Sequence, residues 1–215
     1  MKKSILSRTA SGLLAICLLA ACFLTACGDS GKVSVETFLA ALDVHLAETG
    51  ATVDSGAEFI DITPKDVAKE IGCRIFKDDL YYASYLYYED KVYPLGEWES
   101  GYGVVDMEIS DFNGDGISEL LYAYSFGDGL HKWQIGLFDF ADMSNRTIVD
   151  PIYEGYTFMT DVVLEKNADN DFAIHQVTFD LSSGRFAKMT IATSYKFGRI
   201  TKFNNAPSVE LGSGI

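Results

Sequence analysis

The sequence has few of the residues that most often carry catalysis. Its 215 residues include only three histidines and four cysteines. The histidines, His45, His131 and His175, are far apart, and neither an H-E-x-x-H nor a G-x-S-x-G pattern is present. We therefore interpret the histidines as satisfied or exposed residues rather than catalytic ones. His131 lies two positions before Trp133, and its structural environment is the one that most needs to be inspected.

Basic side chains are also scarce. Seventeen Lys and Arg stand against 31 Asp and Glu, which gives a formal net charge of -14 at pH 7. A strongly acidic surface repels phosphate backbones, so nucleic acid is not an expected partner. It also repels anionic lipid headgroups, so any membrane attachment must come from another feature of the chain.

Long hydrophobic runs are absent after residue 24. The apolar run Gly12–Leu24 is about a dozen residues long, well short of the roughly 20 that a transmembrane helix needs. Lys2, Lys3 and Arg8 precede it, and a basic head followed by a short apolar stretch is typical of a secretory signal peptide. We expect residues 1–26 to be that signal and no later segment to cross a membrane.

The run ends in Leu24-Thr25-Ala26-Cys27, which resembles the lipobox of bacterial lipoproteins. The resemblance implies that Cys27 carries a lipid and that the signal is cut before it. The lipid would hold the protein on the extracytoplasmic face of the cell membrane. Leu19-Ala20-Ala21-Cys22 fits the same pattern, but Cys27 is preferred because a polar, flexible stretch, Gly28–Gly31, follows it. An ordinary signal peptide is the remaining alternative.

Cleavage before Cys27 would change both the charge and the thiol content of the chain. It takes away three basic residues and no acidic one, which leaves 14 basic and 31 acidic residues and a net charge of -17. Cys17 and Cys22 leave with the signal. Because Cys27 would be lipidated, Cys73 is the remaining thiol. No intrachain disulfide is therefore expected, and Cys73 is predicted to be buried and inert.

We expect a tether over 27–33, a helical segment over 34–72, an antiparallel β domain over 73–205 and a flexible tail over 206–215. Apolar residues in the first part of the helical segment recur at three- and four-residue steps.

Capping residues set the bounds of the expected helices. Ser34 suits the start of the first helix and Gly50 its end. Thr63-Pro64 suits the start of a second, short helix, with Thr63 as the cap, and Gly72 its end. Residues 51–62 are predicted to be a loop or a short strand.

The rest of the chain consists of short β-branched and aromatic runs separated by turn residues, which favours strands joined as hairpins. The predicted strands are 80–88, 102–109, 119–126, 132–140, 158–165, 172–181, 186–197 and 199–203. The predicted fold class is therefore mainly β (α+β), with an antiparallel β-meander or blade-like sheets after a short N-terminal helical segment.

The loop 111–119, read as DFNGDGISE, places oxygen-bearing side chains at alternating positions. Asp111, Asn113, Asp115 and Glu119 occupy positions 1, 3, 5 and 9, and Gly116 follows the third of them. Calcium takes six to eight hard oxygen ligands, and a glycine permits the sharp bend that such a loop needs. An EF-hand would place a glutamate at position 12, where Tyr122 stands, and would have flanking helices.

The pattern D-x-N-x-D-G-x-x-E between two strands resembles the calcium loops of FG-GAP and VCBS repeats. This resemblance covers about 20 residues. It implies a structural Ca²⁺ bound by the side chains of Asp111, Asn113, Asp115 and Glu119 and by the main-chain carbonyl of Ile117. The alternative is an ordinary hairpin turn, since Asn-Gly and Asp-Gly pairs form such turns without any ion.

A second acidic stretch, 165–177, repeats the spacing with Asn167, Asp169 and Asp171 but lacks the glycine. We interpret it as chance acidity in a hairpin turn, because one good copy and one degenerate copy cannot close a propeller.

Aromatic residues crowd into the segment 81–102. Exposed rings there could contact a ligand, with Tyr81, Tyr85, Tyr87, Trp98 and Tyr102 as the candidates. Buried rings would simply fill a strand-rich core, and this second interpretation is favoured.

These features predict a membrane-anchored extracytoplasmic lipoprotein that acts as a non-catalytic, calcium-stabilised binding module. The expected ligand is an unknown protein or glycan at the cell surface or outside the cell. The alternatives are an envelope-acting enzyme, an accessory subunit of an envelope complex, or a structural spacer.

Overall fold

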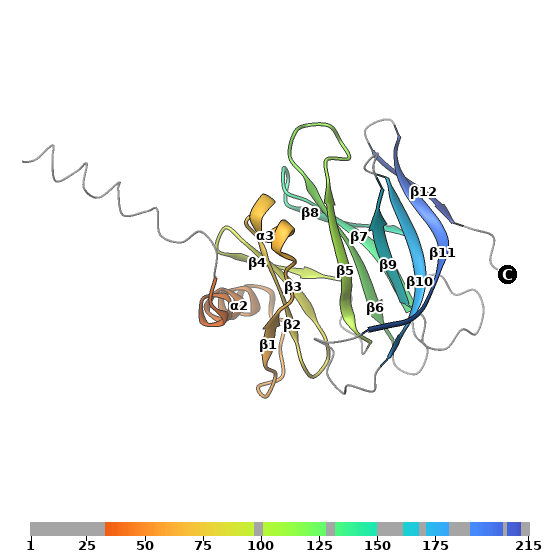
Figure 1. Ribbon diagram of the computed structural model, residues 1–215. Coiled ribbons are helices and arrows are strands. Elements are labelled where there is room, and N and C mark those ends of the chain that lie inside the picture. Colours follow the sequence, from red (N-terminus) through yellow and green to blue (C-terminus); the bar gives the residue numbers. More distant parts are fainter. Residues whose placement is uncertain are drawn as a thin grey trace, which may run out of the picture. The chain divides into compact units, whose positions relative to one another are not determined.

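The computed structural model describes residues 33–96, 101–127, 132–149, 161–167, 171–180, 190–203 and 206–211. This described part is mostly strand, with three four-stranded antiparallel sheets and the helices α2 and α3 (Figure 1). The predicted fold class, mainly β with a short N-terminal helical segment, is thus confirmed. The predicted signal, Cys27 and the tether up to residue 32 lie outside the described residues.

Helix α2 (Val35–Thr49) follows the predicted bounds. The hydroxyl of Ser34 accepts a hydrogen bond from the amide of Thr37 at 3.2 Å and so caps its first turn. Gly50, with a φ of 72°, ends the helix through a hydrogen bond from its amide to the carbonyl of Leu46 at 2.9 Å. The apolar stripe buries Phe38 and Leu42 against the first sheet.

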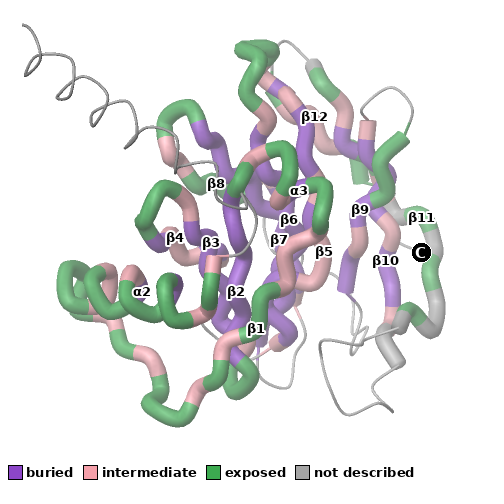
Figure 2. Tube along the Cα trace, turned by 60° about the vertical axis from the view of Figure 1, so that its left-hand side comes forward, coloured by how far each residue is buried: buried purple, intermediate pink, exposed green. Residues whose placement is uncertain are grey.

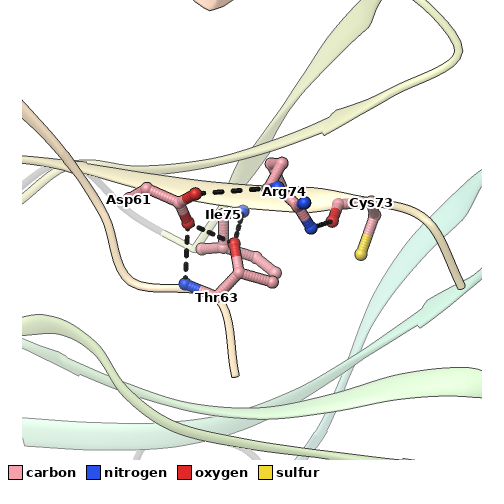
Figure 3. A network of polar contacts seen from close by, with 5 residues as sticks. All are labelled: Asp61, Thr63, Cys73, Arg74 and Ile75. Atoms are coloured by element: carbon pink, nitrogen blue, oxygen red, sulfur yellow. Dashed lines mark hydrogen bonds and ion pairs between the residues drawn. The ribbon is translucent and has the colours of Figure 1, made fainter. Parts of the chain in front are cut away.

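Helix α3 (Lys65–Glu70) starts at the predicted place, but Thr63 does not cap it. Its hydroxyl instead accepts from the amide of Ile75 at 2.7 Å, and its amide donates to Asp61 at 2.9 Å. Figure 3 shows this network, in which Asp61 also pairs with Arg74 at 3.6 Å. The capping prediction was wrong because Thr63 is used to tie α3 to the neighbouring strands.

The three sheets each follow chain order, so each is a simple meander. The first contains β1 (Phe59–Asp61), β2 (Arg74–Asp78), β3 (Ser84–Tyr88) and β4 (Lys91–Leu95). The second contains β5 (Gly103–Ser110), β6 (Glu119–Phe126), β7 (Lys132–Asp139) and β8 (Ser144–Val149). The third contains β9 (Asp161–Lys166), β10 (Phe172–Asp180), β11 (Thr190–Phe203) and β12 (Ala206–Leu211).

The end of the chain differs from the prediction. Residues 206–215 were expected to be a flexible tail, but Ala206–Leu211 forms β12 and pairs with β11. The predicted break between strands near residue 198 is absent, and β11 runs through Gly198. A side chain at Gly198 would meet the carbonyl oxygen of Glu210 at 2.6 Å, so glycine here permits close pairing rather than a turn.

The sheets are stacked through three hydrophobic clusters. One face of the first sheet packs on α2, through Phe76 and Tyr85 among others. Its other face packs on the second sheet, and the second sheet packs in turn on the third. Strand β6 is buried along its whole length (Figure 2). Its alternate side chains enter the two clusters on either side.

Candidate functional site

The candidate calcium loop lies between β5 and β6 of the second sheet, where Ser110 pairs with Glu119 to close the hairpin. Gly114 and Gly116 have φ values of 81° and 89°. These left-handed conformations confirm the bend expected at Gly116, and they favour glycine over other residues.

The side chains predicted to bind calcium accept hydrogen bonds from main-chain amides of the same loop. The carboxylate of Asp111 accepts from the amides of Gly114 at 2.5 Å and Gly116 at 3.1 Å. Asn113 Oδ1 accepts from the amide of Asp115 at 2.8 Å. Asp115 Oδ1 accepts from the amide of Ile117 at 2.7 Å. The alternating oxygens therefore accept hydrogen bonds from nearby main-chain amides, as local Asx hydrogen bonds allow.

Glu119 is the one predicted ligand that lies deep in the protein, with a residue exposure of 1%. Its Oε2 accepts from the amide of Phe112 at 2.7 Å, whereas its Oε1 is buried without a hydrogen-bond partner. Burial raises the pKa of Glu119 above its ordinary value, and the main-chain amides of Phe112 and Asn113 oppose that rise. A buried charge with one unsatisfied oxygen is costly, and a proton or a cation would relieve that cost.

The loop is also fixed to elements far away in the sequence. Phe112 is buried and packs on Phe172 of the third sheet, with ring centroids 5.7 Å apart. Ser118 donates to the carboxylate of Glu70 on α3 at 2.7 Å. Lys202 on β11 donates to the carbonyl of Asp111 at 3.2 Å. The loop thus lies where the second sheet, the third sheet and helix α3 meet.

The donors suit calcium in chemistry but are not gathered around a common point. In the described part of the chain, no three His, Cys, Asp or Glu side chains are close enough to hold a metal ion. Carboxylate, amide and carbonyl oxygens are the ligands that Ca²⁺ prefers, and the unpartnered Glu119 oxygen is such a donor. Asp111, Asp115 and Glu119 would therefore have to turn towards one ion for all three to bind it.

The second acidic stretch occupies the corresponding place in the third sheet, between β9 and β10. The amide of Asn167 donates to the carbonyl of Asp171 at 2.7 Å, a main-chain hydrogen bond that closes the turn. Asp169 lies outside the described residues.

The aromatic candidates separate into core and surface. Tyr85, Tyr87 and Tyr102 are buried, so their prediction as ligand contacts is corrected: they fill the core, as the favoured interpretation had it. Tyr81 is 54% exposed. Trp98 lies outside the described residues.

The remaining single residues agree with structural roles. His175 on β10 lies 2.8 Å from Glu165 and 3.4 Å from Ser194, and His45 is half-buried on α2. Cys73 is buried, and burial raises its pKa to about 12, which keeps the thiol protonated and inert. His131 lies outside the described residues.

Two carboxylates that the sequence did not single out also have structural roles. Asp78 accepts four amides of the turn that follows β2. Asp106 on β5 accepts from the amide of Leu164 on β9 at 2.6 Å, and burial raises its pKa to about 6. An Asp just before a turn is a local signal that could have pointed to Asp78. The link between Asp106 and Leu164 joins residues 58 positions apart and has no local signal.

Comparison of the chain with models of protein families, with curated proteins and with solved structures gave no match. Among the described residues, no helix combines the length and the apolar character required to cross a membrane.

Proposed function

We propose that the protein is a lipoprotein anchored through Cys27 on the extracytoplasmic face of the cell membrane. Its β domain is a non-catalytic module that binds a cell-surface or extracellular protein or glycan. Ca²⁺ held by the loop 111–119 stabilises this module. The basic head, the short apolar run and the lipobox-like Leu24–Cys27 support the anchor.

The observation that carries the calcium part is the buried, unpartnered oxygen of Glu119. Glu119 ends a loop that starts at Asp111 and whose exposed part carries Asp115. Asp111, Asn113, Asp115, Glu119 and the carbonyl of Ile117 would hold the ion. The ion supplies positive charge that offsets the burial of Glu119 and the mutual repulsion of the carboxylates.

A thermal unfolding experiment on the purified full chain tests this. With a Kd of about 10⁻⁴–10⁻³ M, as in extracellular calcium modules, about 10 mM Ca²⁺ should raise the melting temperature by roughly 3–10 °C. Asp115→Ala should abolish that rise, because it removes a ligand from the exposed side of the loop.

Asp142→Ala is the matched control. Asp142 is also exposed and also accepts one amide, that of Ser144 at 2.9 Å, but it lies in another turn. Its variant should keep the full response to calcium. An unchanged melting curve on addition of chelator to the wild type would refute the calcium site.

The anchor is tested by fractionation of cells that express single variants. Cys27→Ser should release the protein from membranes into the soluble extracytoplasmic fraction, and Cys22→Ser should not. The opposite result would assign the lipid to Cys22, and release by neither variant would refute a lipid anchor.

A further inference from the structure

The turn between β2 and β3, residues 79–83, is held by an extensive set of hydrogen bonds. The carboxylate of Asp78 accepts the amides of Leu80, Tyr81 and Tyr82 at 2.6–2.9 Å and that of Ala83 at 3.1 Å. A single buried side chain thus fixes the direction of four successive peptide groups.

The same turn is held from both sides. Asp79 and Glu58 exchange two hydrogen bonds, from the amide of Asp79 to the carbonyl of Glu58 at 2.9 Å and from the amide of Glu58 to Asp79 Oδ1 at 2.8 Å. On the other side, Ser84 Oγ donates to the carbonyl of Tyr82 at 3.1 Å and accepts from the amide of Val104 at 3.0 Å. Tyr82 itself has a φ of 62°, a conformation that costs free energy and persists only where surrounding contacts hold it.

This rigid turn presents two adjacent large apolar side chains to solvent. Leu80 is 45% exposed and Tyr81 is 54% exposed. The flanking residues Glu58 and Asp79 are also exposed, so the two apolar groups lie next to carboxylates. Exposed apolar groups on a fixed backbone lose little conformational entropy when a partner covers them, which favours their use in binding.

We propose that the β2–β3 turn is the docking surface for a cationic segment of a partner protein. This inference rests on the proposed binding function and assigns it a place. Tyr81 and Leu80 act as the apolar anchors, and Glu58 and Asp79 pair with Lys or Arg side chains of the partner.

Charge complementarity identifies this occupant. The chain carries a net charge of -14, and the carboxylates beside the turn add to the attraction for a basic segment. An Arg or Lys can also lie over the exposed face of the Tyr81 ring as a cation–π contact. Leu80 has no hydrogen-bonding group, so it suits an apolar side chain of a protein better than the hydroxyl-rich surface of a glycan.

A random dodecapeptide phage library, panned against the purified full chain, tests the proposal. The enriched peptides should carry a net positive charge together with aromatic or aliphatic residues. For a synthetic peptide of the enriched sequence, Tyr81→Ser and Leu80→Ser should each weaken binding about tenfold or more. The double variant Glu58→Gln with Asp79→Asn should weaken it several-fold and reduce its dependence on salt.

Val44→Ser is the matched control, because Val44 on α2 is a comparably exposed apolar residue, at 57%. It should change the affinity by less than about twofold. Enrichment of neutral or acidic peptides, the absence of any enriched peptide, or affinity unaffected by Tyr81→Ser would overturn the proposal. So would a glycan array on which Tyr81→Ser abolishes binding while peptides do not bind.

The failure of this inference is distinguishable from that of the proposed function. Peptides that bind the Tyr81→Ser variant as tightly as the wild type would place binding elsewhere and leave a binding module intact. A melting curve insensitive to chelator would remove the calcium site and leave the docking surface untouched.

Discussion

The β2–β3 turn and the β5–β6 loop both close around a carboxylate that is almost completely removed from solvent, but they satisfy it differently. Asp78 is 3% exposed, and its two oxygens accept four main-chain amides. Glu119 is 1% exposed, and its Oε2 accepts from the amide of Phe112, while its Oε1 has no hydrogen-bond partner.

The difference indicates which of the two buried carboxylates is satisfied without a bound cation. Four amides supply the positive ends of four dipoles, which replace the water that Asp78 loses on folding. The Oε1 of Glu119 has no such donor to offset its negative charge. Glu119 also belongs to the loop that carries further oxygen atoms suited to bind a cation. The proposed calcium ion would therefore supply charge in the β5–β6 loop, whereas the four amides already supply it in the β2–β3 turn.

The largest expected effect follows from removal of the Asp78 carboxylate, which accepts four main-chain amides. Asp78→Ala leaves four amides without their acceptor, so the free energy of unfolding should fall by about 3–5 kcal/mol. Urea denaturation should give the same loss with calcium and with chelator. Asp79→Ala, which removes the acceptor of one exposed amide, is the control and should cost less than about 1 kcal/mol. A loss for Asp78→Ala that calcium restores would contradict the comparison.

Asp106 is intermediate between Asp78 and Glu119, because it is partly buried and accepts one main-chain amide, that of Leu164. Burial raises its pKa from 3.8 to about 6. The folded protein therefore binds this proton more tightly than the unfolded chain does. The resulting contribution to stability is complete below about pH 4 and is lost as the pH rises through 6.

Asp106→Asn keeps an acceptor for Leu164 and removes the charge. At pH 7.5 it should raise the free energy of unfolding by about 2 kcal/mol, a figure discounted for the partial exposure of the side chain. At pH 4 the variant and the wild type should differ by less than about 0.5 kcal/mol. Urea titrations at both pH values measure this, and an equal effect at the two would show that the charge of Asp106 is not what burial penalises.

Local sequence patterns predicted the helices and the bend of the loop 111–119. The stripe from Val35 to Leu46 with Ser34 and Gly50 at its ends predicted α2 correctly, because caps and periodicity act within a few residues. The strands β2, β4, β8 and β12 fall outside the predicted strands. Three of them, β4, β8 and β12, are edge strands, which only the neighbouring strand reveals. The buried strand β2 is short, and Arg74, Lys77 and Asp78 interrupt its apolar pattern.

The candidate site divides in the same way. The spacing of Asp111, Asn113 and Asp115 and the bend at Gly116 could be read from the sequence, because they depend on one continuous turn. The contacts of Lys202 and Glu70 with this loop join residues 91 and 48 positions from their partners, so they depend on how the sheets stack. The crowded tyrosines gave no sign of which ring would be exposed, because burial is decided by α2 and the second sheet.

The smallest expected effect comes from a substitution that tests the unpartnered oxygen of Glu119. Glu119→Gln keeps an oxygen to accept from the amide of Phe112 and replaces a buried charge by a neutral amide, whose N–H groups the oxygens of the loop can accept. In chelator the variant should be about 1 kcal/mol more stable than the wild type, and the stabilisation by calcium should be largely lost. Denaturation curves with and without calcium measure both changes. Glu70→Gln, which removes a charge near the loop but keeps the acceptor for Ser118, should alter neither by more than about 0.5 kcal/mol. If Glu119→Gln were instead strongly destabilising in chelator, the Glu119 carboxylate would be as self-sufficient as that of Asp78, and the loop would need no cation.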